Sequence, residues 1–458
     1  MKLAFLDRGA ELARLRRLFA RRAPSFAVLY GRRRLGKSRL LREALPSRRA
    51  VYAVGDEREA ATQRASLARE IGRLLPGFER VTYPEWDALL ERWWAEAPDG
   101  AVLALDEFPA LVAAAHELPS LLQKRIDRAA RPLHLVLAGS SQQMMQGLVL
   151  DRTAPLYGRA DEILRLGPLP AGHIRRALRT DDPVRAVEDY AVWGGVPRYW
   201  ELAADWRSRL AAVRELVLSP LGALHEEPAR LLRDDLRDTA QAATLLGLLG
   251  QGCHRPSELA GRLGKPATSL SRPLQRLLEL ELARREVPCG ASPRDSKRSS
   301  YCVADPFLRF WFRFVEPHLS LLGGGGMDAV VQAVERDFPA HAGGIWEELA
   351  RGSVPGLRPG GLAWGAAARW WGPGLDRTPL EVDVVAESAD GKTLLVGEAR
   401  WTRAADVERL TAELRRKAGR LALAAGRRVV LGLWLRQPQR ADADVTVYGP
   451  DDVLRALS

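Results

Sequence analysis

The sequence has 458 residues, and 47% of them are hydrophobic, which predicts a folded protein of roughly three domains. It holds no run of about 18 uninterrupted apolar residues, so we expect no membrane-spanning helix. Charged residues begin at Lys2 and Asp7, too early for a secretory signal peptide, and the three cysteines have no CxxC spacing. These features predict a cytoplasmic protein without structural zinc.

The formal net charge is +12, and such a basic excess is typical of proteins that contact nucleic acid. Arginine greatly outnumbers lysine, however, and alanine is abundant, a composition that a GC-rich genome also produces. The charge alone therefore leaves nucleic-acid binding open.

Strand-like and helix-like segments alternate in the first 166 residues. The apolar runs with strand character are Phe26–Tyr30, Ala50–Val54, Ala101–Leu105, Leu133–Ala138 and Glu162–Leu166. Helical patterns such as Gln63–Leu75 and Leu118–Arg128 lie between them. This alternation predicts an α/β fold with a parallel sheet that is covered on both faces.

A phosphate-binding loop follows the first of these strands. Gly31-x-x-x-x-Gly36-Lys37-Ser38 stands between an apolar strand and an amphipathic helix, which is the context that this motif requires. The two glycines let successive N–H groups point at an anion, and the helix start adds its positive dipole end. Lys37 can reach the β- and γ-phosphates, and the Ser38 hydroxyl can ligate Mg²⁺. The expected nucleotide-binding residues are Gly31, Arg32, Arg33, Arg34, Leu35, Gly36, Lys37, Ser38 and Arg39.

Two later strands of this region also end in polar side chains. The strand Ala101–Leu105 runs into Asp106 and Glu107. In P-loop ATPases the first carboxylate holds Mg²⁺ through water, and the second polarises the attacking water. The strand Leu133–Ala138 is followed by Gly139, Ser140 and Ser141, and Ser140 fits a γ-phosphate sensor. A simple strand-to-loop turn is the alternative for Ser140.

Three further segments are expected after the sheet. Residues 167–230 indicate helices broken by Pro and Gly, and they form a helical lid. Residues 231–305 indicate a winged helix-turn-helix, with helices at Leu231–Leu249, Arg255–Gly264 and Ala267–Leu280 and a hairpin at Ala283–Val303. Residues 306–458 indicate a second α/β domain, which begins with an aromatic block and a flexible joint at Gly323–Gly326 and has a helix near Ile345–Arg351.

The ordered set of motifs resembles the archaeal-type P-loop ATPases of the AAA-related signal-transduction (STAND) group. Besides the loop and Asp106-Glu107, the similar segments are Phe5–Arg8, Gly139–Ser141, Ala154–Arg159, Gly194–Pro197 and Tyr301–Pro317. The resemblance covers nearly the whole chain. It implies a P-loop ATPase domain, a lid, a winged helix and a C-terminal effector domain.

Arg159 follows a tight Tyr-Gly turn and can place a guanidinium on the γ-phosphate, either in the same chain or from a neighbouring subunit. We expect Arg159→Ala to spare ATP binding and to lower turnover. A salt bridge that closes the domain is the alternative role for this arginine.

The third helix of the expected winged helix is the candidate recognition helix. Its polar residues that can reach a groove or phosphates are Thr268, Ser271, Arg272, Gln275 and Arg276. The loop Arg294–Arg298 is basic and wing-like, whereas Glu279 and Glu281 oppose contact with DNA. Docking on a protein partner or on another part of the same chain is therefore an equal alternative.

The last domain resembles PD-(D/E)XK nucleases. In that fold an Asp on one strand and a Glu on the next bind Mg²⁺, which Asp383 and Glu398 match, and Glu347 fits the position of an upstream helical Glu. Arg400 stands where the family has Lys, and an arginine stays protonated and cannot act as a base. An active nuclease, a nucleic-acid-binding relic and a structural role all remain open.

Together these features predict an ATP-hydrolysing molecular switch that uses ATP and Mg and couples nucleotide state to the winged helix and the C-terminal effector domain. Its expected catalytic residues are Lys37, Glu107, Ser140 and Arg159. A DNA-directed nuclease or defence protein regulated by ATP is the alternative. DNA, a protein partner and a second copy of the chain are the candidate partners.

Overall fold

The computed structural model describes residues 3–236, 238–292, 294 and 298–458. The chain divides into two compact units. The N-terminal unit comprises residues 5–168 and 234–236, and the C-terminal unit comprises the described residues of 1–4, 169–233 and 237–458. The four-part division at residues 166, 230 and 305 is finer than this and stays a prediction.

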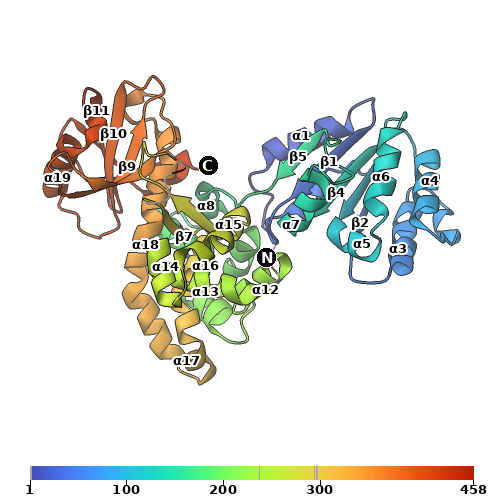
Figure 1. Cartoon of the computed structure of the whole chain (residues 1–458), viewed down its shortest axis with the longest axis horizontal. Helices are drawn as coiled ribbons and strands as arrows, with labels where there is room; N and C mark the ends of the chain where they lie inside the picture. Colours follow the sequence, from blue (N-terminus) through green and yellow to red (C-terminus); the bar gives the residue numbers. More distant parts are fainter. Residues whose placement is uncertain (1–2, 237, 293, 295–297) are drawn as a thin grey trace. The chain divides into compact units, whose positions relative to one another are not determined.

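The N-terminal unit is built on a parallel sheet of five strands (Figure 1). The strands are β1 Ser25–Tyr30, β2 Ala50–Val54, β3 Val102–Asp106, β4 His134–Gly139 and β5 Glu162–Arg165. Their order is β2-β3-β4-β1-β5, and every neighbouring pair is parallel. The α/β fold with a parallel sheet that the alternating pattern predicts is confirmed.

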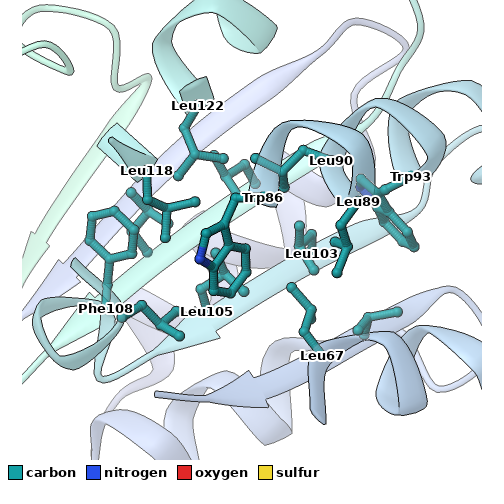
Figure 2. Close-up of a cluster of buried hydrophobic side chains, with 14 of the residues drawn as sticks. Leu67, Trp86, Leu89, Leu90, Trp93, Leu103, Leu105, Phe108, Leu118 and Leu122 are labelled. Atoms are coloured by element: carbon teal, nitrogen blue, oxygen red, sulfur yellow. The ribbon is translucent and has the colours of Figure 1, made fainter. Parts of the chain in front are cut away.

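Helices cover both faces of this sheet. They are α1 Gly9–Phe19, α2 Lys37–Ala44, α3 Ala60–Gly72, α4 Trp86–Glu96, α5 Phe108–Ala114, α6 Leu118–Asp127 and α7 Gln142–Met145. On one face, leucines of α1 and α2 pack against Ala27 and Leu29 of β1. On the other face, Trp86 of α4 lies among leucines from α3, α4, β3 and α6 (Figure 2). Burial of these apolar side chains on both faces holds the sheet rigid and so positions the carboxyl ends of its strands.

The C-terminal unit begins with short helices. They are α8 Ile174–Leu178, α9 Pro183–Trp193, α10 Pro197–Ala203, α11 Arg209–Val213, α12 Glu227–Asp235, α13 Thr239–Gly250, α14 Pro256–Leu263 and α15 Ser271–Glu279. The expectation of one helix over Leu231–Leu249 is wrong. The chain forms α12 and α13 instead, because the Asp238 side chain caps the start of α13 by accepting from the backbone N–H of Gln241.

A two-stranded hairpin follows α15. It pairs β6 Ala283–Glu286 with β7 Ser300–Val303 in antiparallel register. The hairpin packs on α15 and on α13, so the three helices and the two strands lie together. Of the wing-like loop Arg294–Arg298, only the two end residues are among the described residues.

The rest of the C-terminal unit is a mixed sheet with long and short helices (Figure 1). Its elements are α16 Pro306–Phe314, α17 Leu319–Gly323, α18 Met327–Leu357, β8 Ala368–Pro373, β9 Pro379–Glu387, β10 Thr393–Arg400, α19 Val407–Arg420, β11 Arg428–Leu435, β12 Val445–Tyr448 and α20 Pro450–Ala456. The strand order is β12-β11-β10-β9-β8, in which β8, β9 and β10 are antiparallel and β10, β11 and β12 are parallel.

Helix α18 is the central element of this unit. It spans 31 residues, far more than the expected helix near Ile345–Arg351, and it contains Pro339 and Pro355. Packing against α9, β9, β10 and α20 offsets the backbone hydrogen bonds that the two prolines remove. Glu348 of α18 bonds Arg284 of β6 and Arg309 of α16, which ties the hairpin and the aromatic block to this helix.

His341 of α18 makes the stability of the C-terminal unit depend on pH. Its Nε2 lies 2.8 Å from the carbonyl oxygen of Ala191 in α9, and its ring is surrounded by phenylalanines. Burial lowers the pKa of His341 to about 3 from its usual value of 6.5. The unfolded chain therefore takes up a proton below pH 6.5 that the folded chain refuses, so the stability falls as the pH falls from about 6.5 towards 3.

We expect this single histidine to cost roughly 2–3 kcal/mol of unfolding free energy between pH 7 and pH 4.5. Denaturant unfolding of the wild type and His341→Gln at both pH values measures the difference. The glutamine amide can still donate to Ala191 but does not titrate. The variant should therefore lose less unfolding free energy on acidification than the wild type, by that amount. Equal losses in the two proteins would contradict the prediction.

Candidate functional site

The loop between β1 and α2 is shaped by backbone conformations that favour glycine. Gly31 has a φ of +150° and Gly36 a φ of +92°, and Arg34 between them is also left-handed at 67°. A Cβ on Gly31 would lie 2.4 Å from the carbonyl oxygen of Leu166, so a larger residue does not fit there. The loop thus curls tightly before α2 begins at Lys37.

Lys37 is folded back over this loop. Its side chain is 4% exposed, and Nζ donates to the carbonyl oxygens of Gly31 at 2.7 Å and Arg32 at 3.1 Å. The ammonium group is therefore held by neutral acceptors at the mouth of the loop. A phosphate group bound there would be a stronger partner for this charge.

The neighbouring strands β3 and β2 bring two more side chains to the loop, Asp106 and Tyr52. Asp106, the last residue of β3, is 1% exposed and accepts hydrogen bonds from Ser38 Oγ and from the Tyr52 hydroxyl, both at 2.6 Å. Burial, followed by the hydrogen bond to Asp106, raises the pKa of Tyr52 to about 12, so its phenol stays a neutral donor. The hydroxyl of Ser38 and the carboxylate of Asp106 are oxygen ligands that suit Mg²⁺.

Glu107 links the ends of β3 and β4. Its backbone is left-handed, with a φ of 48°, which turns its side chain towards the end of β4. There its carboxylate accepts from the backbone N–H of Ser140 at 3.2 Å and from the Ser140 hydroxyl. The structure thus brings Glu107 and Ser140 into direct contact, although their roles in turnover stay predictions.

The arginines of the loop differ in their surroundings. Arg32 is 7% exposed, Arg33 is exposed and Arg34 is half-buried. The guanidinium of Arg39 lies over the ring of Phe5, 5.8 Å from its centre. Leu35 is buried and anchors the loop.

Arg159 lies at the amino end of the parallel strands, opposite to the phosphate loop. It precedes β5, and the backbone N–H of Asp161 beside it donates to the carbonyl oxygen of Phe26 at the start of β1. The guanidinium is held by Asp127 of α6, at 2.7 and 2.9 Å. Because the phosphate loop lies at the carboxyl end of β1, Arg159 stands near the opposite end of that strand, and its role in turnover stays a prediction.

The candidate recognition helix presents its polar residues to solvent. The expected helix from Ala267 begins as a 3₁₀ turn, Ala267–Leu270, and α15 starts at Ser271. Thr268 of that turn and Ser271, Arg272 and Gln275 of α15 are exposed, and Arg276 is half-buried. Arg276 forms an ion pair with Glu279 at 3.4 Å, so part of the positive charge of this helix is neutralised locally. Arg272 is the strongest remaining candidate for contact with a phosphate.

In the C-terminal sheet, Asp383 of β9 and Glu398 of β10 lie on either side of a guanidinium. Arg400 donates to Asp383 Oδ2 at 2.7 Å and to Glu398 Oε2 at 2.5 Å. Its charge holds the two carboxylates together, which is the task that a metal ion would perform between them. Among the described residues, no group of three or more His, Cys, Asp and Glu side chains is placed to hold a metal ion.

Two residues of these sites are missing from the motifs that the sequence shows. Lys417 of α19 donates to Glu398 Oε1 at 2.7 Å and thus brings an ammonium group to this carboxylate, whose other oxygen accepts from Arg400. Tyr52 of β2 reaches Asp106 from the neighbouring strand. Burial, followed by the charge of Asp383, raises the pKa of Glu347 above its usual value.

Comparison with protein families defines the class of the N-terminal unit. Residues 5–181 match a family model described as an ATPase domain predominantly from Archaea. Residues 311–412 match a model of archaeal and bacterial proteins of unknown function. The chain therefore carries an archaeal-type ATPase domain followed by a C-terminal domain of a type that has no assigned function.

Individual proteins resemble the chain over most of its length. The uncharacterized protein MJECL04 of Methanocaldococcus jannaschii is 26% identical over 423 residues, which are 90% of this chain and 92% of the relative. The Walker-type ATPase PABY2304 of Pyrococcus abyssi has a TM-score of 0.50 at 19% identity and covers 68% of this chain and 96% of its own. This likeness shows a shared P-loop ATPase fold.

The Aeropyrum pernix ORC2 protein, solved with ADPNP and ADP, is a more distant match. Its TM-score is 0.41 at 16% identity, over 73% of this chain and 97% of its own. Within the described residues, no helix of this chain combines the length and apolar character that a membrane span requires.

Proposed function

We propose that the chain is an ATP-hydrolysing molecular switch of the AAA-related STAND type. The observation that carries the proposal is that Lys37, Ser38, Asp106 and Glu107 come together at the carboxyl ends of β1 and β3. These residues supply an ammonium for phosphates, two oxygen ligands for Mg²⁺ and a carboxylate for water.

The residues of the loop fit Mg-ATP. The backbone of Gly31–Gly36 curls as an anion-binding loop does, and the Lys37 ammonium donates to the carbonyl oxygens of Gly31 and Arg32 within it. Ser38 and Asp106, whose side-chain oxygens lie 2.6 Å apart, would hold Mg²⁺. When bound, Mg²⁺ draws negative charge from the oxygens of the β- and γ-phosphates.

Glu107 would orient the attacking water and accept part of its proton. In the structure its carboxylate is occupied by the hydroxyl and the backbone N–H of Ser140. For turnover, at least one oxygen of Glu107 must leave Ser140 and face the γ-phosphate. Ser140 would then be free to donate its hydroxyl hydrogen to that phosphate, which is the behaviour of a sensor.

The switch proposal requires that the nucleotide changes the C-terminal unit. Hydrogen–deuterium exchange of the full chain, measured without nucleotide and with ADP or ATP in Mg²⁺, tests this. We expect ATP to change exchange within residues 169–458 in the wild type and not in Lys37→Ala. Changes confined to residues 5–168 would leave an ATPase without a switch and would overturn the coupling.

DNA is the candidate partner that the recognition helix supports, because Thr268, Ser271, Arg272 and Gln275 are all exposed on it. Steady-state ATPase rates with increasing duplex DNA, for the wild type and an Arg272→Ala/Arg276→Ala double variant, divide the alternatives. Stimulation that the double variant loses supports DNA. A rate that does not respond to DNA favours a protein partner.

Arg159 enters the proposal only through a second copy of the chain. Mixing Arg159→Ala with Lys37→Ala protein tests this role, because each variant supplies the residue that the other lacks. A mixed sample that hydrolyses ATP faster than the sum of its parts supports an active site shared between copies. A strictly additive rate assigns Arg159 to its ion pair with Asp127.

A C-terminal nuclease is the second candidate function, and the contact between Lys417 and Glu398 favours it. With Arg400 moved aside, Asp383 and Glu398 would offer carboxylates to Mg²⁺. Lys417 would supply the lysine that assists the attacking water, because Arg400 stays protonated and cannot act as a base. A plasmid-nicking assay with Mg²⁺ and Mn²⁺ compares the wild type, Asp383→Ala and Lys417→Met. Nicking by the wild type alone supports a nuclease, and equal nicking by all three proteins would exclude this site as its source.

A further inference from the structure

A cavity of about 560 Å³ lies beside β2, the edge strand of the N-terminal sheet. It is separate from the phosphate loop, because none of Gly31–Ser38 lines it. Its volume is within the range of pockets that hold small organic ligands. None of the functions described above uses it.

The buried side chains that line the cavity are mainly leucines, and its exposed side chains are mainly charged. Leu67, Leu105 and Leu111, each under 5% exposed, line it together with Ala53. The rim carries three guanidinium groups, from Arg58, Arg69 and Arg73, against the two carboxylates of Asp56 and Glu70. A ligand that fits both parts has an apolar body and a negative group.

Arg69 is the cation that such a negative group would meet. Arg58 is paired with Asp56, and Arg73 with Glu70 at 2.7 Å. Arg69 instead donates to the hydroxyl of Ser66 at 3.1 Å, a neutral acceptor. Its charge therefore has no carboxylate partner among the described residues, and it stands one turn of α3 from that of Arg73.

The wall of the cavity is built before any ligand arrives. Gln63, 4% exposed, donates to the carbonyl oxygen of Arg58 at 2.8 Å and accepts from the backbone N–H of Asp56 at 3.3 Å. Gly55 donates to the carbonyl oxygen of Asp106 at 2.8 Å, and a Cβ on it would lie 2.6 Å from the carbonyl oxygen of Glu107. The segment 55–58 is thus held on α3 at one end and on Asp106 and Glu107 at the other.

We propose that this cavity binds a small amphipathic organic anion, with its apolar body against Leu67, Leu105 and Leu111 and its negative group on Arg69. Tyr52 also lines the cavity and donates to Asp106. Only the Tyr52 side chain would therefore separate the ligand from Asp106, the carboxylate proposed to hold Mg²⁺. Binding does not depend on the proposed function. An effect of the ligand on ATP turnover does.

The probe for this site is 8-anilinonaphthalene-1-sulfonate, an aromatic anion whose fluorescence rises in an apolar site. We expect saturable binding of about one dye per chain to the full, folded protein without nucleotide. Ser66→Trp places an indole at the cavity and should weaken binding at least about 10-fold, because the dye and the indole compete for one volume. Arg69→Gln should weaken it about 3-fold or more at low salt, with Arg17→Gln of α1 as the control for the same loss of charge.

Circular dichroism of each variant shows whether it is folded. If Ser66→Trp does not fold, Arg69→Gln alone tests the site. Two results would overturn the proposal. The first is dye binding that both cavity variants leave unchanged relative to Arg17→Gln. The second is dye binding that Lys37→Ala abolishes, because the dye would then occupy the phosphate loop. Neither result bears on ATP hydrolysis, so the failure of this site is distinguishable from failure of the proposed switch.

Discussion

A Glu107→Gln variant is expected to bind ATP as the wild type does and to hydrolyse it at least about 100-fold more slowly. The amide keeps the size of the side chain; its oxygen can accept from the Ser140 backbone N–H while its NH₂ donates to the Ser140 hydroxyl oxygen, so the local structure is retained. It cannot take a proton from water, which removes general-base assistance while leaving Lys37, Ser38 and Asp106 unchanged. Steady-state phosphate release, with ATP affinity measured in parallel, gives both quantities.

The matched control for this variant is Glu85→Gln, which removes a charge from an exposed residue at the start of α4 whose side chain caps no backbone group. Its hydrolysis rate should equal that of the wild type. If Glu107→Gln also hydrolyses ATP at the wild-type rate, Glu107 is not the residue that activates water. If it loses ATP binding as well, its contact with Ser140 is required to shape the nucleotide site.

A Gly31→Ala variant is expected to lose at least about 10-fold in ATP affinity and roughly 1–3 kcal/mol of stability in the N-terminal unit. The added Cβ would lie 2.4 Å from the carbonyl oxygen of Leu166. That carbonyl cannot retreat freely, because the backbone N–H of Leu166 donates to Tyr30 at 2.8 Å. The loop must therefore move, and it would carry the backbone N–H groups of the phosphate cradle with it.

Gly9→Ala is the control for this second variant. A Cβ at the start of α1 has no heavy atom within 4 Å, and alanine is a good helix former. Its ATP affinity should equal that of the wild type, and its stability should be equal or slightly higher. Wild-type affinity in Gly31→Ala would show that the nucleotide does not depend on the curl of this loop.

The parts of the site that are contiguous in sequence could be predicted from it. Gly31, Gly36, Lys37 and Ser38 share one motif, and Asp106 ends an apolar strand, so the parallel sheet places them at one edge. Tyr52 and Lys417 could not be predicted in this way. Each meets its carboxylate through tertiary packing from a separate element, and neither belongs to a motif.

The helices of the C-terminal unit show a second limit. Helix α18 continues through Pro339 and Pro355, which in isolation would indicate breaks, because packing on both sides of the helix outweighs local propensity. In contrast, the break between α12 and α13 depends on one capping residue, Asp238, within an otherwise helical pattern. A cap of this kind is visible in the sequence only once the end of the preceding helix is known.

Isothermal titration calorimetry of the full chain with ATP and Mg²⁺ tests the central claim most directly. We predict about one ATP bound per wild-type chain and at least about 30-fold weaker binding by Lys37→Ala, since this ammonium would pair with the phosphates. Lys124→Ala, which removes an exposed lysine of α6, should bind as the wild type does. Equal ATP affinity in the wild type and Lys37→Ala, or no heat of binding in either, would contradict a nucleotide site at Gly31–Ser38.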